Sequence, residues 1–237
     1  IAICEPILPI TGKVLFLNSK TKFQKDMNVK PLFIAATLGL ASCTKTPLTA
    51  TETVYDQSYL VLNEGAFTGG TATLTAIAPD STVEQAFLTE NGLPLGNIGQ
   101  HMLVDDTVLA VSLNNAATVR VIARSSMKEM WSATVSSPRF MASTGNQLVV
   151  ANWGSNFIKL IDLHTGNVAD SIDVYGVSES ILVDYPMAYV ALNGGFGNDN
   201  RVAVVDLATK AVDTVTVGDK PHSFAEANGQ VYVLCAG

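Results

Sequence analysis

A repeated pattern of short apolar runs decides the fold of this chain, and it is clearest in the segment that begins Ala188-Tyr-Val-Ala-Leu-Asn193. The next runs are Val202-Ala-Val-Val-Asp206 and Val212-Asp-Thr-Val-Thr216, and the turn Gly218-Asp-Lys-Pro221 leads into a fourth. Runs rich in β-branched residues, bounded by Gly, Pro, Asn and Asp, are typical of antiparallel β-strands. The segment therefore predicts four consecutive short strands.

The same order of runs recurs upstream. Leu148-Val-Val-Ala-Asn152 and Phe157-Ile-Lys-Leu-Ile-Asp162 match the first two runs, and Asp162 and Asp206 lie 44 residues apart. A weaker copy begins with Val108-Leu-Ala-Val111. A period of this length indicates a repeat architecture, and four strands per repeat is the content of one β-propeller blade. No repeat shows the period of a capped helix, and a β-sandwich or a solenoid are the alternatives.

The repeats resemble those of the YVTN-type β-propeller family, in which a Tyr-Val strand precedes a Val-x-Val-Ile-Asp strand, a hairpin and a Gly-x-x-Pro loop. The residues that carry the resemblance are Tyr189-Val190, Val202–Asp206, Val212, Gly218, Pro221 and Val231-Tyr-Val233. The first repeat, with Leu62-Asn-Glu-Gly65 and Leu93-Pro-Leu-Gly96, resembles instead the outer-membrane lipoprotein branch of that family. The resemblance implies an all-β propeller of four-stranded antiparallel blades over residues 58–237.

The number of repeats predicts a partial ring. Residues 58–237 suffice for about four to five blades, since a blade takes roughly 40 residues. The last repeat begins at Gln230 and stops at Gly237. Because the family that the repeats resemble usually closes with seven blades, we expect a propeller domain that is C-terminally incomplete. A five-bladed closure is the alternative.

The N-terminal part of the chain carries the pattern of an export signal. Lys30 follows Met27, and an apolar run extends from Leu32 to Ala41. A run of this length is too short for a membrane span, which needs about 20 apolar residues. We therefore expect a signal peptide at residues 27–42 and an upstream segment at residues 1–26 that is not part of the mature protein. A membrane span and a buried core helix are the alternatives.

The signal ends in Leu40-Ala-Ser-Cys43, which resembles the lipobox of bacterial lipoproteins. That resemblance implies that Cys43 is acylated and becomes the mature N-terminus, with the Thr- and Pro-containing residues 43–57 as a flexible tether. Thr44, in place of Asp at the next position, implies the outer membrane. We expect an exported lipoprotein that faces the cell surface or the periplasm and meets the membrane only through its lipid.

Composition and charge exclude several classes of protein. The 237 residues are 48% hydrophobic and 15% charged, which excludes a disordered chain. The net charge is −7, and residues 1–42 hold five of the 14 basic but two of the 21 acidic groups. The remaining chain is therefore more acidic than the whole. It lacks the basic stripe that supplies most of the affinity for nucleic acid, so we expect no nucleic-acid partner.

No motif of an enzyme or a metal site occurs in the sequence. Cys4, Cys43 and Cys235 offer no disulfide framework, and the three histidines do not show the spacing of a metal set. Asp162 and Asp206 recur at equivalent strand ends, where we expect them to accept bonds from nearby backbone amides. No Gly-x-Ser-x-Gly or phosphate-cradling loop is present. We therefore predict no catalytic residue, no metal and no cofactor.

Longer loops at one end of the blades carry the candidate ligand-binding residues. Propellers usually bind ligands on such loops, where rigid strands hold aromatic and amide side chains around the mouth of the channel. The candidates are Asn63, Glu64, Asn114, Arg139, Asn152, Trp153, Glu179, Asn193, Phe196, Asn198 and His222. Trp153 and Phe196 would stack on a ring, and Arg139 and His222 would donate hydrogen bonds. The alternative is that the Asn residues only form turns and that Trp153 covers a blade.

These features together predict a non-enzymatic envelope protein that captures a small ligand or nutrient. Relatives in the lipoprotein branch that it resembles capture cobalamin for a TonB-dependent transporter, so a corrinoid is one candidate cargo and such a transporter one candidate partner. The alternative is a scaffold that docks a protein or a glycan at the cell surface. A propeller enzyme, such as a lactonase or a quinoprotein-like dehydrogenase, is the third possibility.

Overall fold

The computed structural model describes residues 53–237, which form five antiparallel sheets and one short helix. The first sheet contains β1 (Tyr59–Asn63), β2 (Thr73–Ala78) and β3 (Ser81–Val83). The second contains β4 (Gly99–Val104), β5 (Val108–Leu113), β6 (Thr118–Ala123) and β7 (Glu129–Thr134). The third contains β8 (Pro138–Ser143), β9 (Gln147–Asn152), β10 (Phe157–Asp162) and β11 (Val168–Asp173). The fourth contains β12 (Ser178–Asp184), β13 (Met187–Leu192), β14 (Arg201–Asp206) and β15 (Val212–Thr216), and the fifth β16 (Pro221–Ala227) and β17 (Gln230–Cys235).

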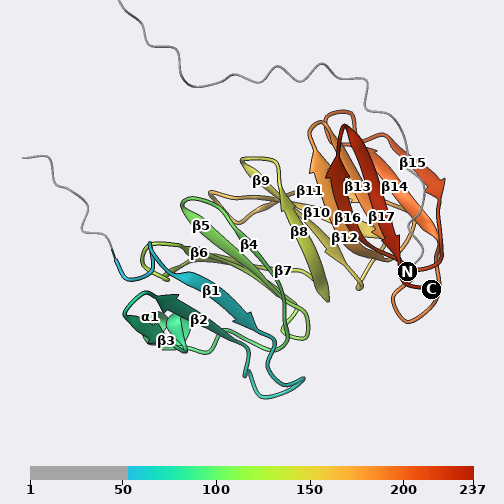
Figure 1. Ribbon diagram of the computed structural model, residues 1–237. Coiled ribbons are helices and arrows are strands. Elements are labelled where there is room, and N and C mark those ends of the chain that lie inside the picture. The colour runs from blue at the N-terminus through green and yellow to red at the C-terminus, as the bar shows by residue number, and fades with distance from the viewer. Residues whose placement is uncertain (1–52) are drawn as a thin grey trace, which may run out of the picture. The chain divides into compact units, whose positions relative to one another are not determined.

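Each sheet is a meander, because every strand pairs with the next strand in the chain. The three middle sheets have four strands each, as the repeat predicts, and the sheets follow one another in chain order (Figure 1). The predicted all-β class and the predicted four-stranded antiparallel blades are therefore confirmed. The signal peptide, the lipobox with Cys43 and the upstream segment all lie outside the described residues.

Neighbouring sheets are held together by three separate apolar cores. Leu74, Phe87 and Leu109 belong to the core between the first two sheets. A second core, which includes Val121 and Val150, joins the second and third sheets. The last of the three cores joins the third and fourth sheets. Central strands such as β5 and β9 contribute residues of both faces to these cores, which explains why they form continuous apolar runs and not an alternation.

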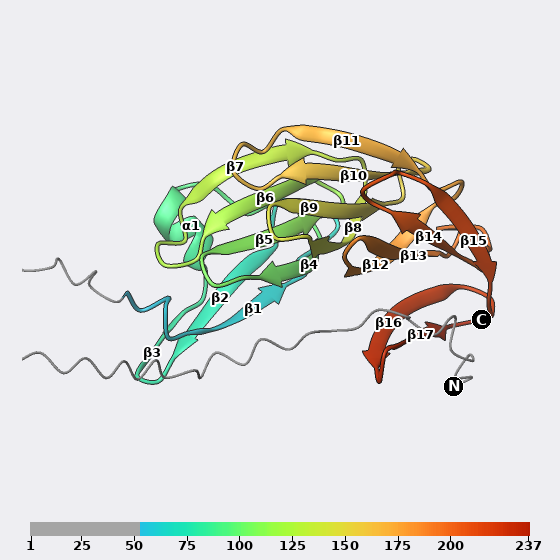
Figure 2. The ribbon, with the colours of Figure 1, turned by 90° about the horizontal axis from the view of Figure 1, so that it is seen from above.

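The first strand of each later sheet lies beside its equivalents. Contacts join β4 to β8, β8 to β12, and β12 to β16. In Figure 2 the last strands β7, β11 and β15 lie along the outer rim of the sheets, on the side away from β4, β8 and β12. The strands of a blade thus run from inner to outer in chain order, and the inner strands line one common face. Side chains near the start of these strands can consequently meet, although about 40 residues separate them in sequence.

One element departs from the sequence prediction, which expected no helix. A helix, α1 (Ala86–Asn91), follows β3 and ends at Gly92, whose backbone is left-handed with φ 69°. Ala86 and Phe87 are buried on it. A helix of six residues has too few turns to produce a periodic apolar pattern, and its first residue lacks a side-chain cap, so neither of the usual signals is present.

The start of the described chain packs against this same sheet. Tyr55 is buried in the core with Phe87, and its hydroxyl donates to the carboxylate of Glu90 at 2.7 Å. Burial and this neighbouring carboxylate raise the pKa of Tyr55 to about 12. Residues 53–57, which the sequence assigns to the tether, thus contact the first sheet. Within the described residues, no helix is long and apolar enough to span a membrane.

The recurring aspartates form the expected local turns. The Asp162 carboxylate accepts the backbone N–H groups of His164 and Thr165, at 2.9 and 2.8 Å. Asp206 accepts those of Ala208 and Thr209 in the same way, at 2.8 and 3.0 Å. These bonds lower the pKa of both carboxyl groups from the ordinary value of 3.8. The interpretation of these aspartates as turn residues is therefore confirmed.

We expect acid to weaken the fold through these two turns. A carboxyl group with a lowered folded pKa contributes its stability above the unfolded pKa and loses it as the pH falls through the folded pKa. The melting temperature should therefore fall as the pH decreases from about 5 to below 3.8. The double variant Asp162→Asn/Asp206→Asn should show a shallower fall in circular dichroism melts. Asp80→Asn, a change in an exposed hairpin, is the control and should keep the original slope. Equal slopes in all three proteins would contradict the assignment.

Candidate functional site

Four polar residues occupy the same position in four successive inner strands. Gln100, Arg139, Glu179 and His222 are each the second residue of β4, β8, β12 and β16. The pairing register of each of these strands with its neighbour shifts at this point. Such bulges re-aim side chains, and they are common beside binding sites. Because the four strands lie in sequence along one face, the four side chains form a single polar row.

Glu179 is the centre of this row. Its side chain is fully buried, and its carboxylate accepts hydrogen bonds from three residues. Arg139 donates from Nε and Nη2 at 3.1 and 2.6 Å, Trp153 from Nε1 at 2.7 Å, and Asn193 from Nδ2 at 3.0 Å. A buried carboxylate is tolerated only when it is paired and hydrogen-bonded in this way. The donors come from the third and fourth sheets, so the carboxylate joins the two blades.

Arg139 extends the network in both directions. Its Nη1 donates to Oε1 of Gln100 at 2.5 Å, which links the second sheet to the third. Its guanidinium lies 4.1 Å from the centre of the Trp153 ring, a cation–π contact. On the other side, Nε2 of His222 lies 3.8 Å from Oε1 of Glu179. The charge of Arg139 is thus balanced by the carboxylate of Glu179.

A loop between β13 and β14 places Phe196 above this network. The Phe196 side chain is fully exposed, and its ring meets the ring of Trp153 edge to face at 5.2 Å between centroids. The loop turns at Gly194, whose φ is +76° and where a Cβ would lie 2.7 Å from the backbone of Asn198. Nζ of Lys220 donates to the carbonyl oxygen of Gly197 at 2.5 Å. The loop is therefore fixed by hydrogen bonds while it presents an aromatic ring to solvent.

A second aromatic group lies beside the row. The ring centroids of His101 and Phe140 are 4.7 Å apart, and those of Phe140 and His222 are 6.1 Å apart. Nδ1 of His101 accepts the backbone N–H of Met141 at 3.3 Å, and burial lowers the pKa of His101. His101 is therefore neutral at pH 7, with its hydrogen on Nε2. Its ring can offer that N–H to a ligand.

The structure brings together five of the eleven predicted ligand-binding residues. Arg139, Trp153, Glu179, Asn193 and Phe196 are in direct contact, and His222 lies beside them. Arg139 and Trp153 both bind Glu179. One face of the Trp153 ring is covered by Arg139, and the indole N–H of Trp153 donates to Glu179, so neither is free for a ligand. Phe196 and His222 are the members of this set that remain accessible.

The other predicted residues take no part in these contacts. Amide groups of Asn63, Asn114 and Asn152 bond the Thr73 hydroxyl, the Pro138 carbonyl and the Phe157 carbonyl, at 3.0, 3.1 and 2.5 Å. Asn63 and Asn152 bond the next strand of their own sheet, whereas Asn114 links the second sheet to β8 of the third. Glu64 and Asn198 are exposed. Within residues 53–237 no three His, Cys, Asp or Glu residues gather as metal ligands.

Sequence analysis missed Gln100, His101 and Phe140. The signal that would have found them is the equivalence of the inner strands, because Gly99-Gln-His101 occupies the place of Pro138-Arg-Phe140 and Pro221-His-Ser223. Strand β4 begins with Gly99, whereas β8 and β16 begin with proline, and this difference obscures the alignment. Position in the repeat is thus a better guide to this site than residue type.

Comparisons with known proteins agree on the fold. No protein-family model and no curated protein matches the chain. Among solved structures, the computationally designed Ika8 protein gives a TM-score of 0.57 at 10% identity, over 76% of this chain and 56% of that one. Dihydro-heme d1 dehydrogenase NirN in complex with DHE gives 0.54 at 16% identity, over 70% and 36%. The WD40 repeats of RRP9 give 0.52 at 11% identity, over 69% and 49%.

The chain spans between about a third and just over half of the length of these three structures. At such low identities the similarity concerns the fold alone and not the activity. Together with the consecutive antiparallel sheets and the cores between them, it shows that the chain has the β-propeller fold.

The buried ion pair in this site should contribute strongly to stability. Replacing Glu179 with Ala would leave the charge of Arg139, whose side chain is 15% exposed, without its partner. Breaking a buried pair in this way costs about 3–5 kcal/mol. We expect urea unfolding of Glu179→Ala to show a loss of that size. The double variant Arg139→Met/Glu179→Met should recover part of it, because neither charge remains but Trp153 and Asn193 still lose their acceptor. A loss below about 1 kcal/mol in the single variant would place the pair among surface salt bridges.

Proposed function

We propose that this protein is a non-enzymatic, lipid-anchored β-propeller of the bacterial cell envelope, of the YVTN type, that captures a small ligand at the mouth formed by its inner strands. The observation that carries the proposal is Phe196, a fully exposed aromatic ring held on a fixed loop directly above the Arg139–Glu179–Trp153 network. Exposed aromatic side chains on rigid supports serve as binding anchors, because little conformational freedom is lost when they bind.

The polar groups around Phe196 favour an uncharged or weakly charged ligand with a flat face. Arg139 is neutralised by Glu179, so it adds orientation without net charge. The side chain of His222, which is 45% exposed, remains accessible for hydrogen bonds. A corrinoid nutrient is one candidate of this class, with a TonB-dependent transporter as the partner that receives it.

Docking of a partner protein or a glycan is the second candidate function. Phe196 is accompanied by Phe67, whose side chain is 68% exposed in the equivalent loop of the first sheet. Two exposed aromatic residues in equivalent loops suit a broad contact as well as a small ligand. Saturation by a small molecule distinguishes the two functions.

Ligand capture predicts saturable stabilisation that depends on Phe196. The full chain with Cys43→Ser, which removes the predicted lipid, would be titrated with cyanocobalamin, haem and oligosaccharides in thermal-shift and calorimetric experiments. We expect one class to raise the melting temperature and Phe196→Ala to weaken its binding at least tenfold, equivalent to about 1.4 kcal/mol. Phe157→Ala, a change in a half-exposed ring on β10, is the control. Binding that is unchanged in Phe196→Ala would contradict the site, and no binding in the panel would favour the docking function.

The lipid anchor is testable by itself. A bacterial host that expresses the natural chain should incorporate an alkyne-labelled palmitate into the protein, and Cys43→Ser should remove the label completely. The acyl chains would hold the protein on the membrane because each buried methylene contributes about 0.8 kcal/mol. Cys235→Ser is the matched control and should keep the label, since Cys235 is buried in β17. Labelling that survives Cys43→Ser would refute acylation at this position.

A further inference from the structure

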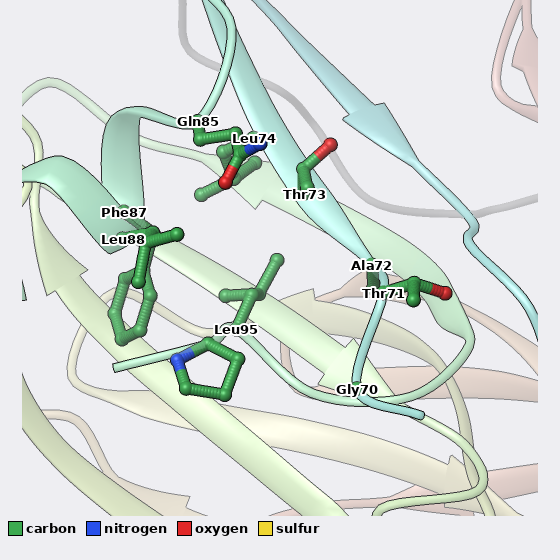
Figure 3. A pocket seen from close by; sticks show the side chains of 10 residues that line it. Gly70, Thr71, Ala72, Thr73, Leu74, Gln85, Phe87, Leu88 and Leu95 are labelled. Carbon is green, nitrogen blue, oxygen red and sulfur yellow. The ribbon is translucent and has the colours of Figure 1, made fainter. Parts of the chain in front are cut away.

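A separate cavity of about 230 Å³ lies in the first sheet, away from the inner strands. It is bounded by the start of β2, by α1 and by the segment at Pro94 and Leu95 (Figure 3). Leu74, Phe87 and Leu95 form its buried walls, while Leu88 lies at its rim and is 38% exposed. The cavity exists because α1 replaces most of the outer strand of this blade, which β3 occupies for only three residues.

Two walls of the cavity are fixed by Arg120 of β6. Its guanidinium lies 5.3 Å from the centre of the Phe87 ring, and its Nε donates to the carbonyl oxygen of Leu95 at 2.9 Å. Arg120 is itself paired with Glu129 of β7. The start of β2 is joined to the segment at Pro94 and Leu95, because the backbone N–H of Ala72 donates to the carbonyl oxygen of Gly96 at 3.0 Å.

The helix is held in place independently. Nδ2 of Asn91 donates to the carbonyl oxygens of Phe87 and Met127, at 2.8 and 2.7 Å, and its Oδ1 accepts the N–H of Glu129 at 2.9 Å. Each wall therefore has hydrogen bonds that do not involve the cavity. A cavity whose walls are fixed in this way is preformed, and it would not close simply by a shift of its side chains.

Gln85 provides an accessible polar side chain at the rim of the cavity. The hydroxyl oxygens of Thr71 and Thr73 accept bonds from the N–H of Ala66 and from Asn63, at 2.6 and 3.0 Å. The amide of Gln85 is exposed and lies beside Leu74 in Figure 3. Although Gln85 is the cap residue of α1, its side chain makes no capping bond within the described chain. Its amide can therefore bind a polar group at the entrance.

We propose that this cavity is a binding site for a small aromatic molecule that carries one hydrogen-bonding group. The aromatic part lies against the flat ring of Phe87 and the apolar ring of Pro94, and the polar group meets the amide of Gln85. An apolar cavity of about 150 Å³ is enough to bind benzene, so 230 Å³ accommodates a bicyclic ring such as indole. None of the residues that line the cavity belongs to the polar row of the inner strands, so the site is independent of the ligand site proposed above.

The test uses three probes of similar size and different chemistry. Indole, benzene and 3-methylbutanol would be titrated into the full chain with Cys43→Ser by calorimetry and thermal shift. We expect indole to bind saturably and to raise the melting temperature. Gln85→Leu should weaken indole binding about tenfold, the size of one neutral hydrogen bond, and leave benzene binding unchanged.

A matched pair of leucine variants locates the binding. Leu88→Trp should fill the cavity and abolish indole binding, whereas Leu93→Trp should not, although Leu93 is equally exposed at 39% and close in sequence. Circular dichroism would confirm that both variants fold, and Leu88→Phe replaces Leu88→Trp if that variant does not. Phe196→Ala should bind indole normally, which separates this site from the mouth of the inner strands.

Three results would overturn the proposal. The first is the absence of saturable indole binding up to its solubility limit in a folded protein. The second is binding that survives in the folded Leu88 variant. The third is a preference for 3-methylbutanol over both aromatic probes, which would contradict the aromatic class of ligand.

Discussion

The buried carboxylate of Glu179 is the constraint on which the arrangement of the inner strands depends. A charge with no access to water must be met by donors that are already in place, and here they come from Arg139, Trp153 and Asn193. Apolar packing between blades has no direction and would tolerate small displacements. The hydrogen bonds to Glu179 do not, so they fix how β8, β9 and β12 lie relative to one another. The surface that carries Phe196 lies on these strands and is therefore held in a fixed position.

Sequence alone predicts the blades well because their cause is local. Runs such as those of β9 and β13 contain the residues that neighbouring blades bury, and the aspartates at Asp162 and Asp206 build the same turn twice. The helix α1 escapes prediction for the opposite reason. It is only six residues long, and its position follows from contacts of Tyr55 and Asn91 with distant residues. Such contacts have no signature in a single segment of sequence.

The site is only partly predictable for a related reason. Residue type identified Arg139, Trp153, Glu179 and Phe196, since such side chains in loops are often functional. Residue type did not show that Arg139 and Glu179 form an ion pair with each other, nor that Gln100 of another blade accepts a hydrogen bond from Arg139. Those facts depend on the packing of one inner strand beside the next. The amides of Asn114 and Asn152 show the converse, because a residue typical of binding loops serves the backbone instead.

The outer edges of the blades have a consequence for how the protein meets other chains. An unpaired strand edge is a template on which a foreign strand can add, and natural sheets usually obstruct it. Here β3 is very short and is followed by a helix, while the pairings of β6 with β7 and of β10 with β11 are both interrupted by a shift in register. A shifted or shortened edge pairs poorly with a straight strand. These three blades are therefore built to resist aggregation along their outer rims, and this protection is independent of whatever the inner strands bind.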